Sequence, residues 1–334
     1  MHSRNSIDAT FRQTQTAEGL RWMFQDVQPG GPAAVAGARP TDVLLRIDDD
    51  EIVPPKEPAF RMGHTATMRV LRSDGSRETL NFQVNVPPPK YPKYPYADSR
   101  SVIATKINAA TGLLKVTKFP GIIGVDFAHE VDGGFRELRG SQRLILDLRG
   151  NPGGGIGGLR LMSYLTPGRL PVGYSLTRYR AEHGYSRESL PRLNRIPGQK
   201  WMLPFLALRF VGRDQSIVVV TEGLGQQTFH GRTVILVNEH TAGSGEMVAG
   251  FAKENGLAKI VGMKTAGRLL GAEGFSVDGG YVLALPIASY LSWNGHRFEG
   301  NGVTPEMVVD WDPKSVSDGT DNQLKTALEV VSKL

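Results

Sequence analysis

The chain has 334 residues, and 39 lysines and arginines against 33 aspartates and glutamates leave a net charge of +6. Hydrophobic residues make up 40% and charged residues 22%, values that exclude a chain disordered over most of its length. Cysteine is absent, which excludes disulfides, thiolate zinc sites and a cysteine nucleophile. The length predicts about two domains.

The charge and hydropathy patterns exclude two further classes of function. No apolar run is long enough to span a membrane, and Met1 is followed by polar residues, so we expect no signal peptide in this chain. The basic residues are scattered along the sequence, which favours a mildly basic solvated surface over a nucleic-acid partner.

The first part of the chain predicts a β-rich module. Residues 1–15 form a polar arm with little pattern, and the module spans 16–86. Small residues predict a short helix over 33–38, with Gly37 as its C-cap. Strands are expected at 43–47, 67–71 and 79–84, the last two joined by the turn Ser73-Asp74-Gly75.

A proline-rich stretch separates this module from the rest. Residues 87–96 read Pro-Pro-Pro-Lys-Tyr-Pro-Lys-Tyr-Pro-Tyr. Proline fixes φ and lacks an N–H donor, so the segment is stiff and extended. We interpret 87–100 as a linker, the alternative being a docking motif for a partner.

The remaining residues, 101–334, predict a layered α/β domain. Apolar runs at 144–148, 216–221, 234–237, 258–261 and 281–285 are typical of buried strands. Residues 244–255 have helical spacing, and Gly256 is the stop signal. Alternation of strand, helix and strand indicates layers of sheet and helix.

Five segments of the chain resemble known proteins. Asp26 to Gly37, followed by Asp42 to Asp48, is similar to a PDZ domain. Leu144 to Gly155, Val237 to Val248 and Glu299 to Pro305 resemble the C-terminal processing peptidases, the tail-specific and tricorn-like serine proteases. Their order and spacing fit that family over almost the whole chain.

The resemblance implies a fold and a function. The fold would be α/β, with a crotonase-like peptidase core and a PDZ-like domain that selects substrates. The activity would be cleavage of proteins near their free C-termini, with protein or peptide partners and without a metal or other cofactor. The family often works outside the cytoplasm, which favours a periplasmic or secreted location.

Ser244 is the serine that could act as the nucleophile. It follows the apolar strand 234–237 through a turn and opens a helix, a position that directs N–H groups and the helix dipole at a developing oxyanion. Gly245 would supply one donor and Gly153 or Gly154 the other. The alternative is that Ser244 only caps the helix.

Two positions depart from the family pattern. Most members carry the nucleophile three residues before the glutamate that opens the helix, and here that residue is Gly243. Many members have a lysine base twenty-two residues after that glutamate, and here Arg268 stands there and stays protonated. Lys264 is four residues away.

The tricorn-like branch implies another base. In that branch a histidine beside a serine, in an arm before the PDZ domain, is oriented by a glutamate ahead of Gly-Val-Thr-Pro. The matching residues are His2, Ser3 and Glu299. The expected relay has Ser244 attacking and His2 accepting its proton. The alternatives are a frayed terminus for His2 and a solvated charge for Glu299.

The PDZ-like module would bind a peptide by its own mechanism. Such modules pair a peptide with a sheet edge and hold its terminal carboxylate in a backbone loop. Residues Gly19, Leu20, Arg21 and Trp22 are the candidates for that loop and strand. The alternative is that Leu20, Trp22 and Phe24 line the edge of the module's core.

Other chemistry has weaker signals. The glycine run 153–158 lacks the Gly-Lys-Ser/Thr ending of a phosphate loop, and no histidine pair has metal-ligand spacing. His240 and His129 are secondary candidates for the base.

Two functions therefore stay open. The first is a serine endopeptidase that acts by acyl transfer. The second is an inactive member that binds peptides, indicated by Gly243 and Arg268, including the case of a nucleophile replaced by glycine through engineering.

Overall fold

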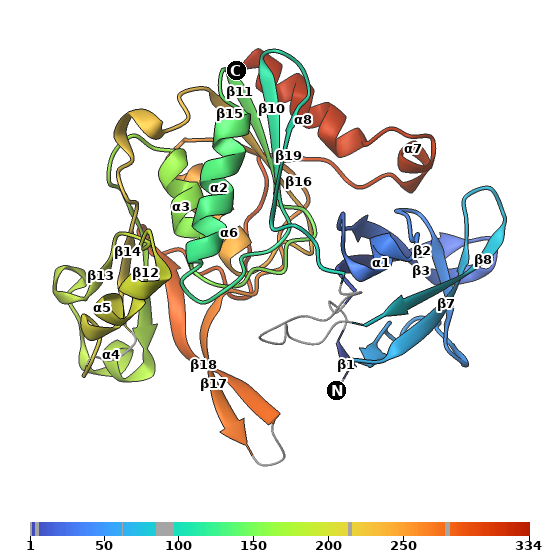
Figure 1. Ribbon diagram of the computed structural model, residues 1–334, viewed down its shortest axis with the longest axis horizontal. Helices are drawn as coiled ribbons and strands as arrows, with labels where there is room; N and C mark the ends of the chain where they lie inside the picture. Colours follow the sequence, from blue (N-terminus) through green and yellow to red (C-terminus); the bar gives the residue numbers. More distant parts are fainter. Residues whose placement is uncertain (1, 4–6, 62, 85–96, 213–215, 278–280) are drawn as a thin grey trace. The chain divides into compact units, whose positions relative to one another are not determined.

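The computed structural model describes residues 2–3, 7–61, 63–84, 97–212, 216–277 and 281–334 (Figure 1). The chain divides into two compact units. Unit 1 comprises residues 1–100 and 310–325, and unit 2 comprises residues 101–309 and 326–334. The fold is mixed α/β, as the sequence predicts.

Unit 1 is built on one antiparallel sheet. Its strand order is β2-β3-β4-β7-β8, with β5 paired to β4. The bounds are β2 Ala9–Thr16, β3 Gly19–Val27, β4 Val43–Ile47, β5 Asp50–Glu51, β7 Thr65–Leu71 and β8 Arg77–Gln83. The strands β1 His2–Ser3 and β6 Phe60–Arg61 pair with each other, and the helices are α1 Pro32–Val35 and α7 Pro313–Ser317.

The core of unit 1 is aromatic, and it includes part of the expected arm. Phe11, Phe24, Phe60 and Phe82 pack with ring centroids 4.5–6.3 Å apart. Phe11 belongs to β2, which lies in residues that the sequence analysis gave to a polar arm. Only Ala9 and Phe11 are apolar in β2, so the alternation was too weak to indicate a strand.

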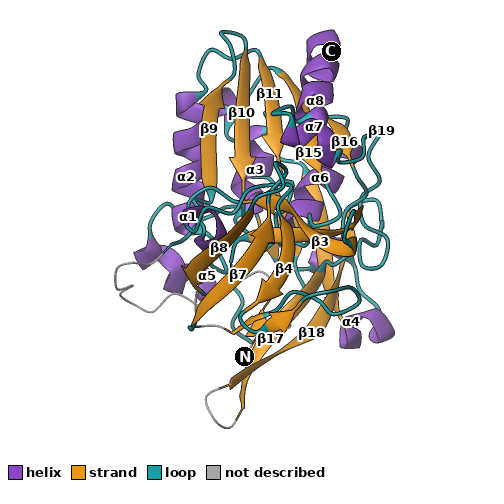
Figure 2. Cartoon of the chain, turned by 90° about the vertical axis from the view of Figure 1, so that its right-hand side faces the viewer, coloured by secondary structure: helices purple, strands orange, loops and turns teal. Residues whose placement is uncertain are grey.

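Unit 2 contains a six-stranded sheet whose middle strands are parallel. Its order is β19-β16-β15-β11-β10-β9, and only the β9–β10 pair is antiparallel (Figure 2). The bounds are β9 Val102–Lys106, β10 Thr111–Val116, β11 Arg143–Asp147, β15 Arg232–Val237, β16 Lys259–Gly262 and β19 Met307–Val308. Strands β11 and β15 are buried almost throughout because they lie in the middle of the sheet.

Helices cover this sheet. They are α2 Val125–Glu137, α3 Gly158–Tyr164 and α6 Ser244–Glu254, and α2 and α3 lie side by side. Leu146, Ile235, Phe127 and Phe251 are fully or almost fully buried in the shared core. Helix α8, Asn322–Lys333, ends the chain.

A second sheet in unit 2 has the order β13-β14-β12-β18-β17. Its bounds are β12 Pro171–Thr177, β13 Arg192–Leu193, β14 Val218–Val220, β17 Leu270–Val277 and β18 Tyr281–Ser292. The hairpin of β17 and β18 projects from unit 2 (Figure 1). The remaining helices are α4 Arg178–His183 and α5 Leu203–Leu208, with 3-10 turns at Arg187–Ser189, Lys200–Met202 and Gly225–Gln227.

The predicted strands at 43–47, 67–71, 79–84, 144–148, 216–221, 234–237, 258–261 and 281–285 are confirmed, with ends shifted by a few residues or extended. The predicted helix at 244–255 is confirmed as α6, and the one at 33–38 as the shorter α1.

Candidate functional site in unit 2

Two loops meet at the carboxyl ends of β11 and β15. The Asn151 side-chain amide donates to the Val116 carbonyl at 2.8 Å, and the Asn151 backbone carbonyl accepts the Ala242 N–H at 2.9 Å. The Asn238 side chain accepts the Gly150 N–H at 2.9 Å, and the Thr241 hydroxyl donates to the Leu148 carbonyl at 2.8 Å. These bonds fix the glycine-rich loop against the turn that leads into α6.

Gly243 is the apex of that turn. Its backbone has φ 53° and ψ −122°, a conformation that side chains rarely adopt, and it is half-buried just before α6. A Cβ added there would lie 3.3 Å from the Gly153 Cα and 3.9 Å from the Gly154 nitrogen. A side chain at position 243 would be directed at the glycine-rich loop, in tight contact with Gly153 and with a strained backbone.

The side chain of Ser244 points elsewhere. Ser244 is 5% exposed, and its hydroxyl lies 2.7 Å from the Gly155 carbonyl and 3.1 Å from the Gly154 carbonyl, both acceptors. Among the residues that the structure describes, no basic nitrogen hydrogen-bonds this hydroxyl. Its contacts link α6 to the glycine-rich loop.

The amides around Gly243 divide into two groups. The Gly153 N–H donates to the Asn151 side chain at 2.8 Å, and the Gly245 N–H donates to the Ala242 carbonyl at 3.0 Å. The N–H groups of Gly154 and Ser244 have no hydrogen-bond partner within the described part of the chain. Of the donors expected from the sequence, Gly154 is therefore available, whereas Gly153 and Gly245 donate within the loop.

The sequence pattern pointed to the Ser244 hydroxyl rather than to the Ser244 N–H. The signal that finds it is positional, since an amide directly after a strand-to-helix turn has no partner in the first turn of the helix. Helix α6 adds the positive end of its dipole at the same point.

The buried carboxylate of Glu246 stabilises the turn at Gly243, and the sequence analysis did not name it as a site residue. It is fully buried and accepts four hydrogen bonds. The donors are the N–H of Gly243 at 3.1 Å, the Thr265 hydroxyl at 2.6 Å, and the N–H groups of Gly267 at 2.7 Å and Arg268 at 2.8 Å. The sequence signal for this role is a glutamate at the third position of a helix, where its carboxylate can accept the N–H of the residue three positions earlier.

Arg268 lies against Gly243 through the backbone. The Gly243 N–H donates to the Arg268 carbonyl at 3.0 Å, and the Arg268 side chain is exposed. Glu299 accepts the N–H of the next residue, Leu269, at 2.8 Å. The structure thus brings Gly243, Arg268 and Glu299 into one cluster, together with Gly153, Gly154, Ser244 and Gly245.

A buried ion pair lies under the glycine-rich loop. Asp147 accepts from Arg149 at 2.8 and 2.9 Å and faces Lys115 at 3.5 Å. Burial alone would raise the pKa of Asp147, but the charges of Arg149 and Lys115 and the Arg149 hydrogen bonds lower it below its usual range. Asp147 therefore stays ionised and anchors Arg149 at the start of the loop.

The secondary histidine candidates lie in other surroundings. The His240 backbone N–H donates to the Asn238 side chain at 3.2 Å, and the His129 ring contacts the Gly198 carbonyl at 2.9 Å. Across the described residues, no group of three or more His, Asp or Glu side chains could hold a metal ion. In the same residues, no helix is long and apolar enough to cross a bilayer.

The remaining predicted site residues belong to unit 1. The backbone of His2 and Ser3 pairs with Arg61 and Phe60, and the side chains of both lie outside the described part. Their relay with Ser244 stays a prediction.

The predicted peptide-binding segment begins β3, where Gly19 has φ 92°. Gly19, Leu20, Arg21 and Trp22 all pair with β2, so their edge on that side is filled. The Trp22 indole donates to the Lys56 carbonyl at 2.7 Å, and Leu20 is 42% exposed. Because β2 pairs only with β3 among the described strands, the open edge on this side of the sheet is β2.

The chain is similar to a family of peptidases and to several proteins in it. Residues 110–309, more than half of the chain, match the model of peptidase family S41. The carboxyl-terminal-processing proteases of Picosynechococcus and Synechocystis are each 26% identical over 91% of this chain. A probable CtpA-like serine protease of Staphylococcus aureus is 23% identical over 86% of it.

The chain spans 65%, 63% and 50% of the lengths of these three relatives. Two solved structures share the fold. The photosystem II D1 C-terminal processing protease has a TM-score of 0.55 and 19% identity, covering 97% of this chain and 76% of that one. A putative S41 protease from Bacteroides fragilis has a TM-score of 0.60 and 16% identity, covering 97% and 82%. On the family match over residues 110–309, this chain belongs to peptidase family S41.

Proposed function

We propose that unit 2 binds an extended peptide and holds one of its carbonyl oxygens at the turn before α6, without cutting the chain. One observation carries this proposal: the turn that would present a nucleophile has glycine at its apex, while the Ser244 hydroxyl faces the carbonyls of Gly154 and Gly155. Family membership supports a polypeptide as the ligand.

The binding mode follows from the free donors. The N–H groups of Gly154 and Ser244 flank Gly243, and Gly154 is exposed to solvent. A peptide carbonyl oxygen accepts two such N–H groups well, and the α6 dipole adds to the attraction. These groups bind a ground-state carbonyl and need no proton transfer.

Serine-type hydrolysis is the second candidate, favoured by the serine proteases among the relatives. In this proposal the Ser244 oxygen bonds to the peptide carbonyl carbon and its proton passes to His2, which Ser3 and Glu299 orient. The C–N bond then breaks, the proton moves to the leaving amine, and water hydrolyses the ester. The Ser244 hydroxyl would first have to leave the Gly154 and Gly155 carbonyls.

We propose that unit 1 is a PDZ-like module that selects peptides with free C-termini. Its antiparallel sheet and short helix support this assignment. We also propose that unit 2 has a crotonase-like fold. An added peptide strand would hydrogen-bond to the outer edge of β2 rather than to the paired Gly19–Trp22 segment.

The decisive experiment compares turnover and binding in matched variants. Turnover of an unstructured protein with an apolar C-terminus is measured for the parent, Ser244→Ala, Gly243→Ser and the double variant Gly243→Ser with Arg268→Lys. Binding of a labelled peptide is measured for Ser244→Ala and Ser244→Pro. Proline is tolerated in the first helical turn, so this pair differs mainly in the N–H of residue 244.

Holding without cleavage predicts no turnover by the parent and a gain of turnover in the Gly243→Ser variants. It also predicts peptide binding that survives Ser244→Ala and falls at least tenfold in Ser244→Pro. Turnover by the parent that disappears in Ser244→Ala would instead establish hydrolysis. Turnover equal in the parent and Ser244→Ala would remove Ser244 from the chemistry altogether.

A further inference from the structure

The helix α5 carries apolar side chains on its solvent side as well as on the side that faces the core. Leu203, Leu206 and Phe210 pack against the hydrophobic core of unit 2 and follow the spacing i, i+3 and i+7. The large apolar side chains that stay exposed on and beside this helix are Trp201, Met202, Phe205, Leu208 and Val211. Apart from Met202 they are 62–71% exposed. We call these five residues the α5 patch.

The patch rests on a packed part of unit 2. Lys200, directly before it, pairs with Asp126 of α2 at 2.6 Å, and the His129 ring of the same helix contacts the Gly198 carbonyl at 2.9 Å. The rings of Trp201 and Phe205 meet edge to face, with their centroids 6.2 Å apart. The exposed rings are therefore held together on a supported surface.

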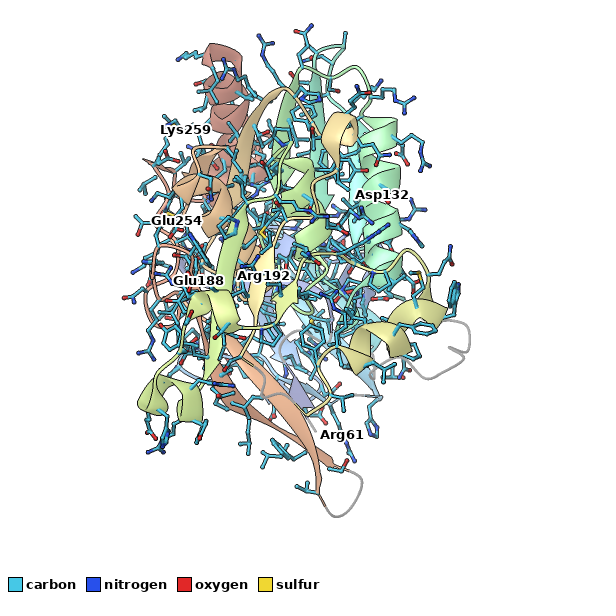
Figure 3. The ribbon with its side chains drawn as sticks, turned by 90° about the vertical axis from the view of Figure 1, so that its left-hand side faces the viewer. Arg61, Asp132, Glu188, Arg192, Glu254 and Lys259 are labelled. Carbon is cyan, nitrogen blue, oxygen red and sulfur yellow. The ribbon has the colours of Figure 1, made fainter. Side chains whose placement is uncertain are left out.

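The charged residues of the same segment all have one sign. Residues 192–212 contain four basic side chains and neither aspartate nor glutamate. The four are Arg192, Arg195, Lys200 and Arg209; all are exposed, and Arg192 is labelled in Figure 3. An apolar patch that is accompanied by basic residues alone favours an anionic partner over a cationic one.

We propose that the α5 patch docks unit 2 onto a membrane surface that contains anionic lipid. Trp and Phe side chains favour the boundary between lipid headgroups and acyl chains, and basic residues beside them attract anionic headgroups. A second copy of the chain fits less well, because a two-fold contact through the patch would bring the basic groups of one copy against the same groups of the other. The docking is shallow, and it is independent of the function proposed for the turn at Gly243.

Co-sedimentation of the full chain with lipid vesicles tests the proposal. The vesicles consist of phosphatidylcholine alone or of phosphatidylcholine and phosphatidylglycerol in equal parts. The parent should bind the mixed vesicles at least tenfold more tightly than the neutral ones, and this preference should disappear at high salt. Equal binding to both kinds of vesicle at low salt, or no binding to the mixed vesicles, would overturn the proposal.

Two pairs of variants compare the patch with similar exposed residues elsewhere. Val211→Ser should weaken binding to the mixed vesicles at least threefold and Val35→Ser should leave it unchanged, although these valines are 71% and 69% exposed. Arg209→Gln should weaken binding and reduce its dependence on salt, whereas Arg61→Gln, on β6 of unit 1, should change neither. Equal affinities within either pair would overturn the proposal.

Tryptophan fluorescence reports which part of the chain enters the lipid. Trp201 is exposed, whereas Trp22 and Trp293 are half-buried and Trp311 is buried. Lipids that are brominated on their acyl chains should quench the emission of the parent, and Trp201→Phe should lose most of this quenching. Quenching that persists in Trp201→Phe would contradict docking through the patch.

Analytical ultracentrifugation without lipid separates membrane docking from self-association. The double variant Trp201→Ser with Phe205→Ser should bind mixed vesicles at least tenfold more weakly than the parent and should have the same sedimentation coefficient. A dimer of the parent that the double variant does not form, together with equal vesicle binding by both, would overturn the proposal and assign the patch to a second copy.

Discussion

The turn at Gly243 and the α5 patch, both in unit 2, present opposite kinds of chemical groups. Around Gly243 the free donors are backbone N–H groups, placed by a strand end, a helix start and a glycine-rich loop. In the α5 patch the exposed groups are apolar side chains on and beside one short helix. The comparison teaches that the first site depends on the backbone path, whereas the second depends on side chains that can be exchanged singly.

The largest expected effect comes from removing the side chain that fixes the backbone site. Glu246→Ala leaves the N–H groups of Gly267 and Arg268 and the Thr265 hydroxyl without their acceptor, while the Gly243 N–H keeps the Arg268 carbonyl, so the variant should cost about 4 kcal/mol of unfolding free energy. Urea denaturation measures this loss. Glu246→Gln keeps the shape and one acceptor oxygen, so it should cost about 2 kcal/mol. Equal, small losses of unfolding free energy in both variants would contradict this prediction, because the loop backbone would then be stable without the Glu246 carboxylate.

Asp147 supplies the charged support under the same loop. Asp147→Asn breaks a buried ion pair with Arg149 and should cost about 3 kcal/mol at neutral pH. Because the folded pKa of Asp147 is lowered, its contribution is present above the unfolded value of about 3.9 and is lost as pH falls through the folded pKa. Below pH 4 the parent should therefore lose stability faster than the variant. Parallel pH profiles from chemical denaturation would contradict this assignment.

Two glycines with positive φ sharpen the comparison, because a severe Cβ clash adds to the backbone strain at only one of them. A Cβ at Gly154 would lie 2.1 Å from the Phe119 carbonyl oxygen, so Gly154→Ala should cost about 3 kcal/mol. A Cβ at Gly243 has no neighbour closer than 3.3 Å, so Gly243→Ala should cost less, about 2 kcal/mol, mainly from its unfavourable φ and ψ. Thermal unfolding of both variants measures the two losses of stability. A larger loss in Gly243→Ala than in Gly154→Ala would refute the loop geometry.

The smallest effect is expected at Ser244. Ser244→Ala removes the bonds to the Gly154 and Gly155 carbonyls and should cost about 1 kcal/mol of unfolding free energy. Peptide binding should change less than twofold, because the N–H of residue 244 remains. A tenfold loss of binding in Ser244→Ala would show that the hydroxyl itself contacts the ligand.

The sequence was most informative where periodicity and glycine pattern carry the fold. Apolar runs such as 144–148 and 234–237 predicted the buried strands, because central parallel strands are apolar on both faces. Strand β2 was not predicted, because only two of its eight residues are apolar. Segment 310–325 joins unit 1 by a return of the chain that no local pattern indicates.

The motifs pointed to segments that lie together in the structure, but they did not indicate which individual N–H groups are free. The motifs located Gly153, Gly154, Gly243, Ser244, Gly245, Arg268 and Glu299, and the structure gathers all of them. Which amide is free depends on hydrogen bonds within the loop, such as that from Gly153 to Asn151, and spacing does not encode them. The α5 patch required the packing of the helix, because the residues on both its buried and its exposed side are apolar.

The start of the β17–β18 hairpin is fastened to the turn before α6. Leu269, directly before β17, donates its N–H to Glu299, and the preceding carbonyl accepts the Gly243 N–H. If the base of the β17–β18 hairpin moves, either those two hydrogen bonds break or Gly243 moves with it. Tilting of the hairpin would therefore displace the carbonyl that accepts the Gly243 N–H.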